Sequence, residues 1–190
     1  ALHIKVNAGA NTVPGWEADD AYLQEGDDYA KYETFDVSAV GAAPMEVYQT
    51  CCHHGPTFVF GSLPNGTYTV KLHFADPAYD AAAVTSERAM DVRIEGQVVL
   101  SGYDIVAAAG GGHKAVGEQF TIGVADGDGM TIALDAASGN DAFVCGIEII
   151  ATTGPAAPWF SVSAPGAGDV RAAGTQTLIE WTSGNAADAM

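Results

Sequence analysis

The sequence predicts an all-β protein, a β-sandwich or β-barrel with few and short helices. Short runs alternate apolar and polar residues with a period of two, which is typical of strands with one buried face. Glycine, proline, asparagine or aspartate closes these runs. No stretch combines an apolar period of 3.6 residues with helix caps. With 190 residues, 48% hydrophobic and 16% charged, the chain has the composition of a folded protein rather than a disordered one.

Four predicted strands show their inward face directly. In residues 67–74 every second residue is apolar, and a period of two places these residues on the core face. Residues 90–94, 120–124 and 130–134 repeat the alternation. The residues predicted to face the core are Tyr68, Val70, Leu72, Phe74, Met90, Val92, Ile94, Phe120, Ile122, Val124, Met130, Ile132 and Leu134.

Further strands are predicted at both ends of this region. Leu2–Val6 reads as a strand from the start, and Phe143, Cys145, Ile147 and Ile149 form a late inward-facing run.

Two glycine-containing turns predict hairpins. The turn Glu95-Gly96-Gln97 leads from residues 90–94 into residues 98–100. The turn Asp126-Gly127-Asp128-Gly129 separates residues 120–124 from residues 130–134, and a second hairpin is expected there.

A change of composition predicts a domain boundary near residue 152. Residues 1–152 form the first module, and residues 153–158 are a small, uncharged Pro/Ala linker. Residues 159–190 contain strand patterns at Trp159–Val162 and Leu178–Trp181, too few to enclose a core. This tail either packs on the first module or begins a second β module. We favour the second alternative, in which the chain is a monomeric part of a larger multidomain protein.

The charge of the chain excludes several classes of partner. Seven Lys and Arg face 24 Asp and Glu, a formal net charge of −17, which repels phosphate backbones and anionic lipid. Nucleic acid is therefore not an expected partner. No apolar run approaches the ~20 residues that span a bilayer, so no membrane insertion is expected. The carboxylates suit a solvated, salt-tolerant surface or Ca²⁺ binding, and we favour the surface over any cofactor.

Cys51-Cys52-His53-His54 places potential soft-metal ligands in succession. Adjacent residues of an extended chain point to opposite faces, so they cannot converge on one ion without a sharp bend, and no metal is expected. A vicinal disulfide between Cys51 and Cys52 stays open as an alternative in an oxidising compartment. Cys145 lies among apolar residues and is predicted to be a buried thiol.

Catalytic motifs are missing from the sequence. It contains no G-x-S-x-G elbow, no H-E-x-x-H pair and no Cys-His setting of a protease. The run Gly110-Gly111-Gly112-His113-Lys114 lacks the strand-to-helix setting of a phosphate-binding loop, and we expect it to connect strands. The chain is therefore not expected to be an enzyme.

Six segments, in this order, resemble the malectin domain and the malectin-like carbohydrate-binding modules of secreted bacterial proteins. Their order and spacing across about the first 150 residues carry the resemblance. The segments are Ile4–Gly9 (IKVNAG), Val47–Thr50 (VYQT), Gly66–Asp76 (GTYTVKLHFAD), Asp91–Gly96 (DVRIEG), Tyr103–Ile105 (YDI) and Cys145–Ile149 (CGIEI). The tail, with FSVSAPGAGD and AAGTQTLIEWTS, resembles the start of an Ig-like repeat of secreted cell-wall proteins.

The resemblance implies a jelly-roll-like β-sandwich, malectin-like and galactose-binding-like, whose loops at one end hold a sugar. Aromatic rings would stack on the sugar, and carboxylates or amides would bind its hydroxyls. By position, Tyr29 matches a pocket aromatic and His53 replaces a tyrosine. Ala78 and Tyr79 replace two adjacent aromatics, and Asn140 replaces an aspartate. The candidate carbohydrate-binding residues are Tyr29, His53, Asp76, Tyr79, Asn140 and Asp141.

Two functions follow from this resemblance. The first is a non-catalytic carbohydrate-binding module of a secreted multidomain protein, which holds an oligosaccharide or polysaccharide such as a glucan. In that case a polysaccharide-active enzyme is the expected attached domain. The second is a structural or adhesive cell-surface domain with a degenerate sugar pocket, which the replacements at His53 and Ala78 favour. Both place the chain outside the cell or at its surface.

Overall fold

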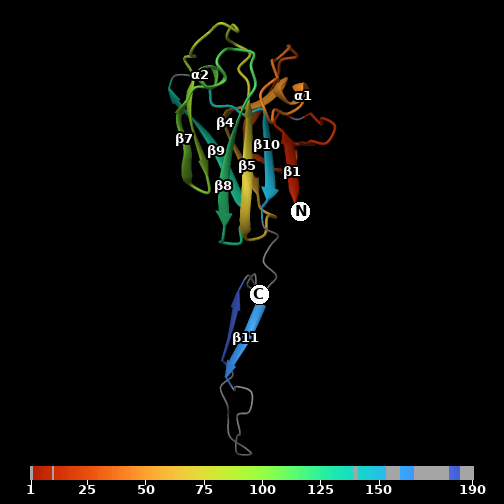
Figure 1. The fold of residues 1–190 in the computed structure, drawn as a ribbon, viewed down its shortest axis with the longest axis vertical. Coiled ribbons are helices and arrows are strands. Elements are labelled where there is room, and N and C mark those ends of the chain that lie inside the picture. Colours follow the sequence, from red (N-terminus) through yellow and green to blue (C-terminus); the bar gives the residue numbers. More distant parts are fainter. Residues whose placement is uncertain (1, 10, 139–140, 153–158, 165–179, 185–190) are drawn as a thin grey trace, which may run out of the picture. The chain divides into compact units, whose positions relative to one another are not determined.

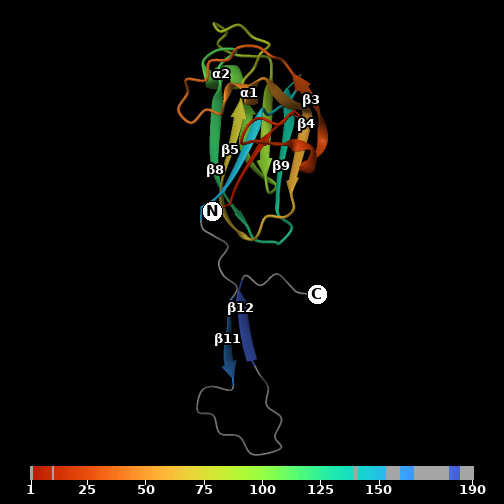
Figure 2. The same cartoon turned by 90° about the vertical axis from the view of Figure 1, so that its right-hand side faces the viewer.

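The computed structural model describes residues 2–9, 11–138, 141–152, 159–164 and 180–184. The chain divides into two units, Ala1–Gly154 and Pro155–Met190. The first unit contains two five-stranded sheets that form a sandwich, which confirms the predicted all-β class (Figures 1 and 2). The predicted boundary at residue 152 and the linker 153–158 stay predictions, because residues 153–158 lie outside the described residues.

The first sheet has the strand order β2-β1-β10-β5-β8. All of its neighbouring strands are antiparallel except β1 and β2, which are parallel. Its strands are β1 (His3–Asn7), β2 (Glu17–Ala18), β5 (Gly66–Phe74), β8 (Val116–Val124) and β10 (Gly146–Ala151).

The second sheet has the order β3-β4-β9-β6-β7, and all of its pairs are antiparallel. Its strands are β3 (Leu23–Ala30), β4 (Thr50–Phe60), β6 (Ala89–Ile94), β7 (Gln97–Tyr103) and β9 (Met130–Ser138).

The alternating runs form strands with the predicted inward faces. Tyr68, Val70, Leu72 and Phe74 of β5 are buried, as are the predicted inward residues of β6 and β9. In β8, Ile122 and Val124 are buried, while Phe120 is half-buried against the core. The core between the sheets is therefore built from the residues that the period of two indicates.

One predicted hairpin is confirmed and the other is wrong. β6 and β7 pair through a tight turn at Glu95 and Gly96, whose φ angles are 52° and 69°. By contrast, β8 belongs to the first sheet and β9 to the second. The turn at residues 126–129 therefore carries the chain across the sandwich. A turn sequence shows that the chain reverses, but not which sheet receives the next strand.

Helices in the described residues are short, as expected. They are α1 (Met45–Tyr48), α2 (Ile105–Ala109) and one 3₁₀ turn η1 (Asp19–Ala21). Asp104 begins α2 by accepting a hydrogen bond from the backbone N–H of Ala107, and Gly110 ends it with a φ of 70°.

The second unit contains an antiparallel pair of strands in its described residues. β11 (Trp159–Ala164) pairs with β12 (Glu180–Gly184), with a register shift between Val162 and Ala164. The predicted strand at Leu178–Trp181 is described only from residue 180 onward.

Candidate functional site

The site lies at the end of the first unit that carries α1 and α2 (Figure 1). The end of β3, the beginning of β4, the segments before β6 and β10, and the segment after β5 all meet there, because these antiparallel strands begin or end at the same edge of their sheets. We call this end of the sandwich the loop end. Residues that lie far apart in the sequence are brought together here.

A backbone bridge joins the two sheets at the loop end. The N–H of Cys52 donates to the carbonyl of Val144 at 3.0 Å, and the N–H of Val144 donates to the carbonyl of Cys52 at 3.1 Å. Cys52 lies in β4 of the second sheet, and Val144 lies just before β10 of the first. The bridge therefore fixes the positions of the neighbouring residues His53 and Phe143.

A pocket of about 250 Å³ opens beside this bridge. Its lining combines aromatic, basic and acidic side chains from both sheets and their loops. The lining residues are Tyr29, Lys31, Cys51, His53, Pro77, Ala78, Arg88, Asp141 and Phe143.

Aromatic rings form one part of the pocket wall. Tyr29 lies opposite Cys51 in the β3–β4 ladder, and 44% of Tyr29 is exposed. Its ring centroid is 5.6 Å from that of His53, with an angle of 57° between the planes. Phe143 is buried and adds a further ring to the lining. An exposed ring beside buried ones can cover an apolar face of a ligand.

Two cations line the pocket, although the whole chain has only seven Lys and Arg. Nζ of Lys31 lies 3.0 Å from the Glu33 carboxylate and donates to the carbonyl of Pro77 at 3.0 Å. Arg88 lies with its Cζ 5.7 Å from the centroid of the Phe143 ring. These contacts hold hydrogen-bond donors at the pocket wall.

Asp76 lies beneath the pocket rather than in its wall. The residue is 1% exposed, and its Oδ1 accepts the backbone N–H of Ala78 at 2.8 Å. The same oxygen is 3.5 Å from Nη1 of Arg88. Asp76 therefore acts on the pocket through the positions of Ala78 and Arg88.

Tyr79 is half-buried and does not line the described pocket. Its hydroxyl accepts the backbone N–H of Glu87 at 3.0 Å, and Cζ of Arg88 lies 6.0 Å from its ring centroid. Its carbonyl lies 3.0 Å from Nδ1 of His113. Tyr79 thus links two loops behind the pocket.

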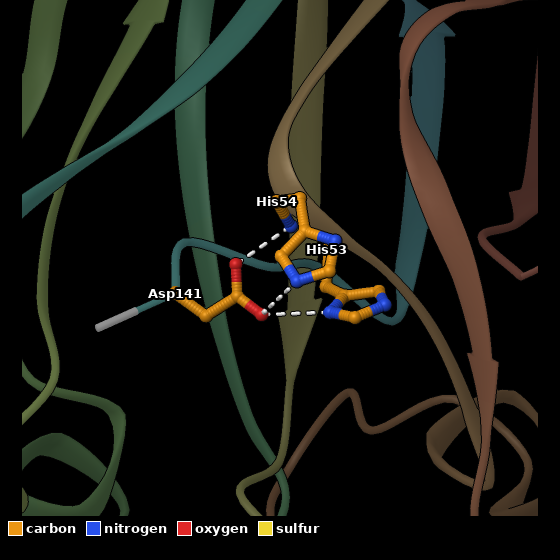
Figure 3. A group of neighbouring side chains, drawn as sticks. All are labelled: His53, His54 and Asp141. Carbon is orange, nitrogen blue, oxygen red and sulfur yellow. Dashed lines mark hydrogen bonds and ion pairs between the residues drawn. The ribbon is translucent and has the colours of Figure 1, made fainter.

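His53, His54 and Asp141 form a compact cluster at the pocket edge (Figure 3). Nδ1 of His53 is 2.7 Å from Oδ2 of Asp141, and Nε2 of His54 is 3.7 Å from the same oxygen. The backbone N–H of His54 donates to Oδ1 at 2.7 Å, which fixes the carboxylate. A hydrogen bond with Asp27 raises the pKa of the His54 imidazole, and the charge of Asp141 adds to this effect.

The structure thus brings together three of the predicted site residues, Tyr29, His53 and Asp141, in one pocket. Asp76 and Tyr79 lie next to it, and Asn140 lies outside the described residues. The glycine run connects the helix α2 to the strand β8, whereas we expected it to connect two strands.

Sequence reasoning missed the basic side chains and assigned Phe143 to the core alone. Lys31 and Arg88 lie outside the alternating runs, so periodicity gives no indication of them. The sequence signal that could have identified Lys31 and Arg88 is the rarity of basic residues in this acidic chain.

The three cysteines are free and buried. Burial raises the pKa of the thiols of Cys52 and Cys145 to about 12, and that of Cys51 well above its ordinary value. The vicinal disulfide is therefore not formed in this structure.

Trp16, which follows the first strand, packs its ring edge-on against His73 with 5.4 Å between the centroids.

Acidic side chains also gather at the opposite turns. Glu95, Asp126 and Asp128 bring carboxylate oxygens within 4.8 Å of one another and are exposed or half-exposed. Exposed carboxylates often lie this close without an ion, so calcium binding stays an untested alternative to the favoured solvated surface.

Residues 2–152 match the malectin domain family, and the chain therefore belongs to that family. Its fold is similar to that of the plant receptor-like kinase ANX2, with a TM-score of 0.67 at 20% identity. The match covers 78% of this chain and 47% of that one. The extracellular domain of ANXUR1 from Arabidopsis thaliana gives a TM-score of 0.67 at 19% identity, with coverage of 78% and 47%.

Two other similar structures have different contexts. A chain of the crystal structure of the plant peptide RALF23 in complex with FER and LLG2 matches with a TM-score of 0.63 at 17% identity. The match covers 78% of this chain and 48% of that one. A calcium-binding mutant of Bacteroides uniformis β-glucuronidase 2 matches with a TM-score of 0.62 at 21% identity, covering 80% and 18%. This chain therefore spans about half or less of the length of these proteins. At such identities the likeness concerns the fold.

No curated protein matches the chain. In the described part of the chain, no helix is long and apolar enough to cross a membrane.

Proposed function

We propose that the first unit is a non-catalytic carbohydrate-binding module that holds a saccharide in the loop-end pocket. The observation that carries the proposal is the meeting of Tyr29, His53 and Asp141 in one pocket of about 250 Å³. Membership of the malectin domain family supports the same function.

The chemistry of the pocket wall suits a sugar. A pyranose offers apolar C–H faces and a rim of hydroxyls, so it needs both flat rings and polar groups of fixed orientation. Tyr29 supplies an exposed ring, and Phe143 extends the apolar wall. Asp141, Lys31 and Arg88 supply acceptors and donors for hydroxyls.

The residues behind the wall have a positioning function in this proposal. Asp76 holds Ala78 and Arg88, and Tyr79 contacts both Arg88 and the backbone of Glu87. Asn140, predicted from the family pattern, remains a candidate for a direct sugar contact.

Secretion and attachment to a larger, polysaccharide-active protein belong to the same proposal. The resemblance of the tail to an Ig-like repeat of cell-wall proteins supports them, as do the similar structures described as ectodomains or extracellular domains. Glucans are the first saccharides to test.

The test is a glycan array of α-glucans, β-glucans and marine polysaccharides, followed by calorimetry with the best ligand. Tyr29→Ala should weaken binding at least tenfold, because loss of a stacking ring removes apolar contact from the pocket wall. Tyr32→Ala is the matched control, since Tyr32 is 74% exposed and does not line the pocket.

Equal loss of affinity in both variants would contradict the assigned pocket. No binding to any glycan would overturn the proposal and favour the alternative, a structural or adhesive surface domain with a degenerate pocket.

A further inference from the structure

A bend in β4 places two adjacent imidazoles on the same side of the strand. His54 has a φ of 63° and Gly55 a φ of 72°, both in the left-handed region. At this point the register against β3 shifts, between the pairs Glu25–Thr57 and Asp27–His53. The ring centroids of His53 and His54 are consequently only 3.8 Å apart. Regular strand geometry would have separated them, since it alternates the side chains.

Gly26 in the opposite strand accommodates the bend. Gly26 of β3 has a φ of 118°, and a Cβ at this position would lie 2.8 Å from Sγ of Cys52 and 3.0 Å from the carbonyl oxygen of His53. Only glycine allows β3 to approach the bent segment so closely. The histidine arrangement is therefore built into the backbone.

The donor atoms of His53, His54 and Asp141 have the spacing of a shared metal ion. The three atoms lie within 4.8 Å of one another, and the distances to Asp141 Oδ2 are 2.7 Å from His53 Nδ1 and 3.7 Å from His54 Nε2. Donors on one tetrahedral zinc lie about 3.3 Å apart, given bond lengths of about 2.0–2.2 Å. The two distances to Asp141 lie on either side of this value, so shifts of about half an ångström would seat an ion.

We propose that His53, His54 and Asp141 bind one divalent transition-metal ion, with Zn²⁺ as the reference ion. Imidazole nitrogens favour ions such as Zn²⁺, Ni²⁺ and Cu²⁺, whereas Ca²⁺ and Mg²⁺ favour sites made of oxygen ligands. This site therefore differs in selectivity from any calcium site in the acidic turns. Three protein ligands leave at least one coordination position open, as in zinc sites that bind water or substrate.

Asp27 prepares His54 for this function. Its Oδ2 lies 2.8 Å from Nδ1 of His54, so a neutral His54 donates from Nδ1 and keeps its lone pair on Nε2. That lone pair faces the Asp141 carboxylate across 3.7 Å. Nε2 of His54 and Oδ2 of Asp141 are then both acceptors, and a cation between them would stabilise this arrangement. A carboxylate on the far nitrogen of a histidine ligand is the usual orienting contact in metal sites.

The cluster also borders two hollows of the surface. His53 and Asp141 line the saccharide pocket, and His54 and Asp141 line a second hollow with Gly55, Asp135 and Ala142. An ion held there is accessible from solvent. Metal binding can be tested without sugar, because all three ligands come from the protein, although His53 and Asp141 also line the saccharide pocket.

The test is a Zn²⁺ titration by calorimetry on the full chain without a histidine tag, in the absence of sugar. We expect one ion per chain in the wild type, at least a tenfold loss of affinity in His54→Gln, and a tenfold to hundredfold loss in Asp27→Asn. His54 has a side chain that is 59% exposed, so its replacement should leave the fold intact. His3→Gln is the matched control, because it removes a histidine that pairs with a different carboxylate, Glu148.

A second measurement separates this site from the thiols. Co²⁺ bound to the two imidazoles and the carboxylate should give visible d–d absorption without a thiolate-to-metal charge-transfer band. A thiolate band, equal affinity in wild type and His54→Gln, or displacement of the bound Co²⁺ by Ca²⁺ more readily than by Zn²⁺ would each overturn the proposal. Loss of glycan binding alone would not affect it.

Discussion

Nε2 of His73 lies 3.0 Å from Oε1 of Glu148, and both residues are buried. Leu72 and Phe74 face the core, so His73 points to the outer face of the first sheet. There Trp16 packs against its ring, and the hydroxyl of Tyr48 is 3.1 Å from its Nδ1. Segments outside the sheets therefore bury the hydrogen-bonded pair of His73 and Glu148 on a face that the sequence pattern marks as polar.

The first prediction is a loss of stability in acid that depends on Glu148. Hydrogen bonds from His73 and His3 lower its pKa from 4.5 to about 2. A lowered folded-state pKa stabilises the fold fully above pH 4.5, and this contribution is lost as the pH falls from 4.5 toward about 2. At about 1.4 kcal/mol per pKa unit, it amounts to about 3 kcal/mol.

Urea unfolding at a series of pH values measures this contribution. Glu148→Gln should be less stable at pH 7 and should show a smaller decline between pH 4.5 and about 2, the interval between the two pKa values. Parallel pH profiles for wild type and variant would show that Glu148 does not carry the acid sensitivity.

The second prediction concerns Gly112, which packs against the loop that carries Tyr79. A Cβ at this position would lie 1.7 Å from the carbonyl oxygen of Tyr79 and 2.9 Å from that of Asp80. Gly112→Ala must displace this backbone, and we expect it to lower stability by about 1–3 kcal/mol. Gly123→Ala is the control, since a Cβ there meets nothing within 4 Å. Similar melting temperatures for the two variants would argue against a close loop contact.

The third prediction is that Gly26→Ala disrupts the bend at His54. The substitution places a methyl group 2.8 Å from Sγ of Cys52 and also strains a backbone with a φ of 118°. Gly127→Ala shares the strain, with a φ of 86°, but its Cβ has no neighbour within 4 Å. Strain alone costs about 1–2 kcal/mol. Gly26→Ala should therefore lose more stability than Gly127→Ala, and it alone should weaken Zn²⁺ binding. Unchanged Zn²⁺ affinity in Gly26→Ala would show that metal binding does not depend on the close approach of β3 to the bend.

The fourth prediction is that the thiols do not react in the native protein. The thiolate is the reactive form, and burial keeps Cys52 and Cys145 protonated up to a pKa of about 12. Cys51 is 8% exposed, and its pKa is also raised by burial. A disulfide-exchange reagent at pH 8 should label all three cysteines only after denaturant is added. Rapid labelling of a thiol in the native protein would contradict this.

The strands were predictable from the sequence because the alternation of apolar residues is a local property. Residues 67–74 and 90–94 carry the full pattern, and they form β5 and β6 with the predicted buried faces. The pairing of β8 and β9 was not predictable from their turn. Both strands need an apolar partner layer, and either sheet of a sandwich supplies one.

The site was predictable only in part, for two physical reasons. Tyr29 followed from its position in a family pattern and Asp141 from its place beside Asn140, but Lys31 and Arg88 have no periodic context. The convergence of His53 and His54 depends on a positive φ at His54, a backbone conformation that residues other than glycine seldom adopt. An argument from regular strand geometry therefore excluded a cluster that an irregular strand allows.

The bridge between Cys52 and Val144 consists of backbone hydrogen bonds alone. Such bonds form with almost any side chain, so the neighbouring position 53 can be substituted while the spacing of the sheets is maintained. At the loop end, the hydrogen bonds that join the two sheets are thus independent of the side chains that would contact a ligand. This makes the unit a suitable scaffold for engineering new ligand specificities by substitution at a few rim positions.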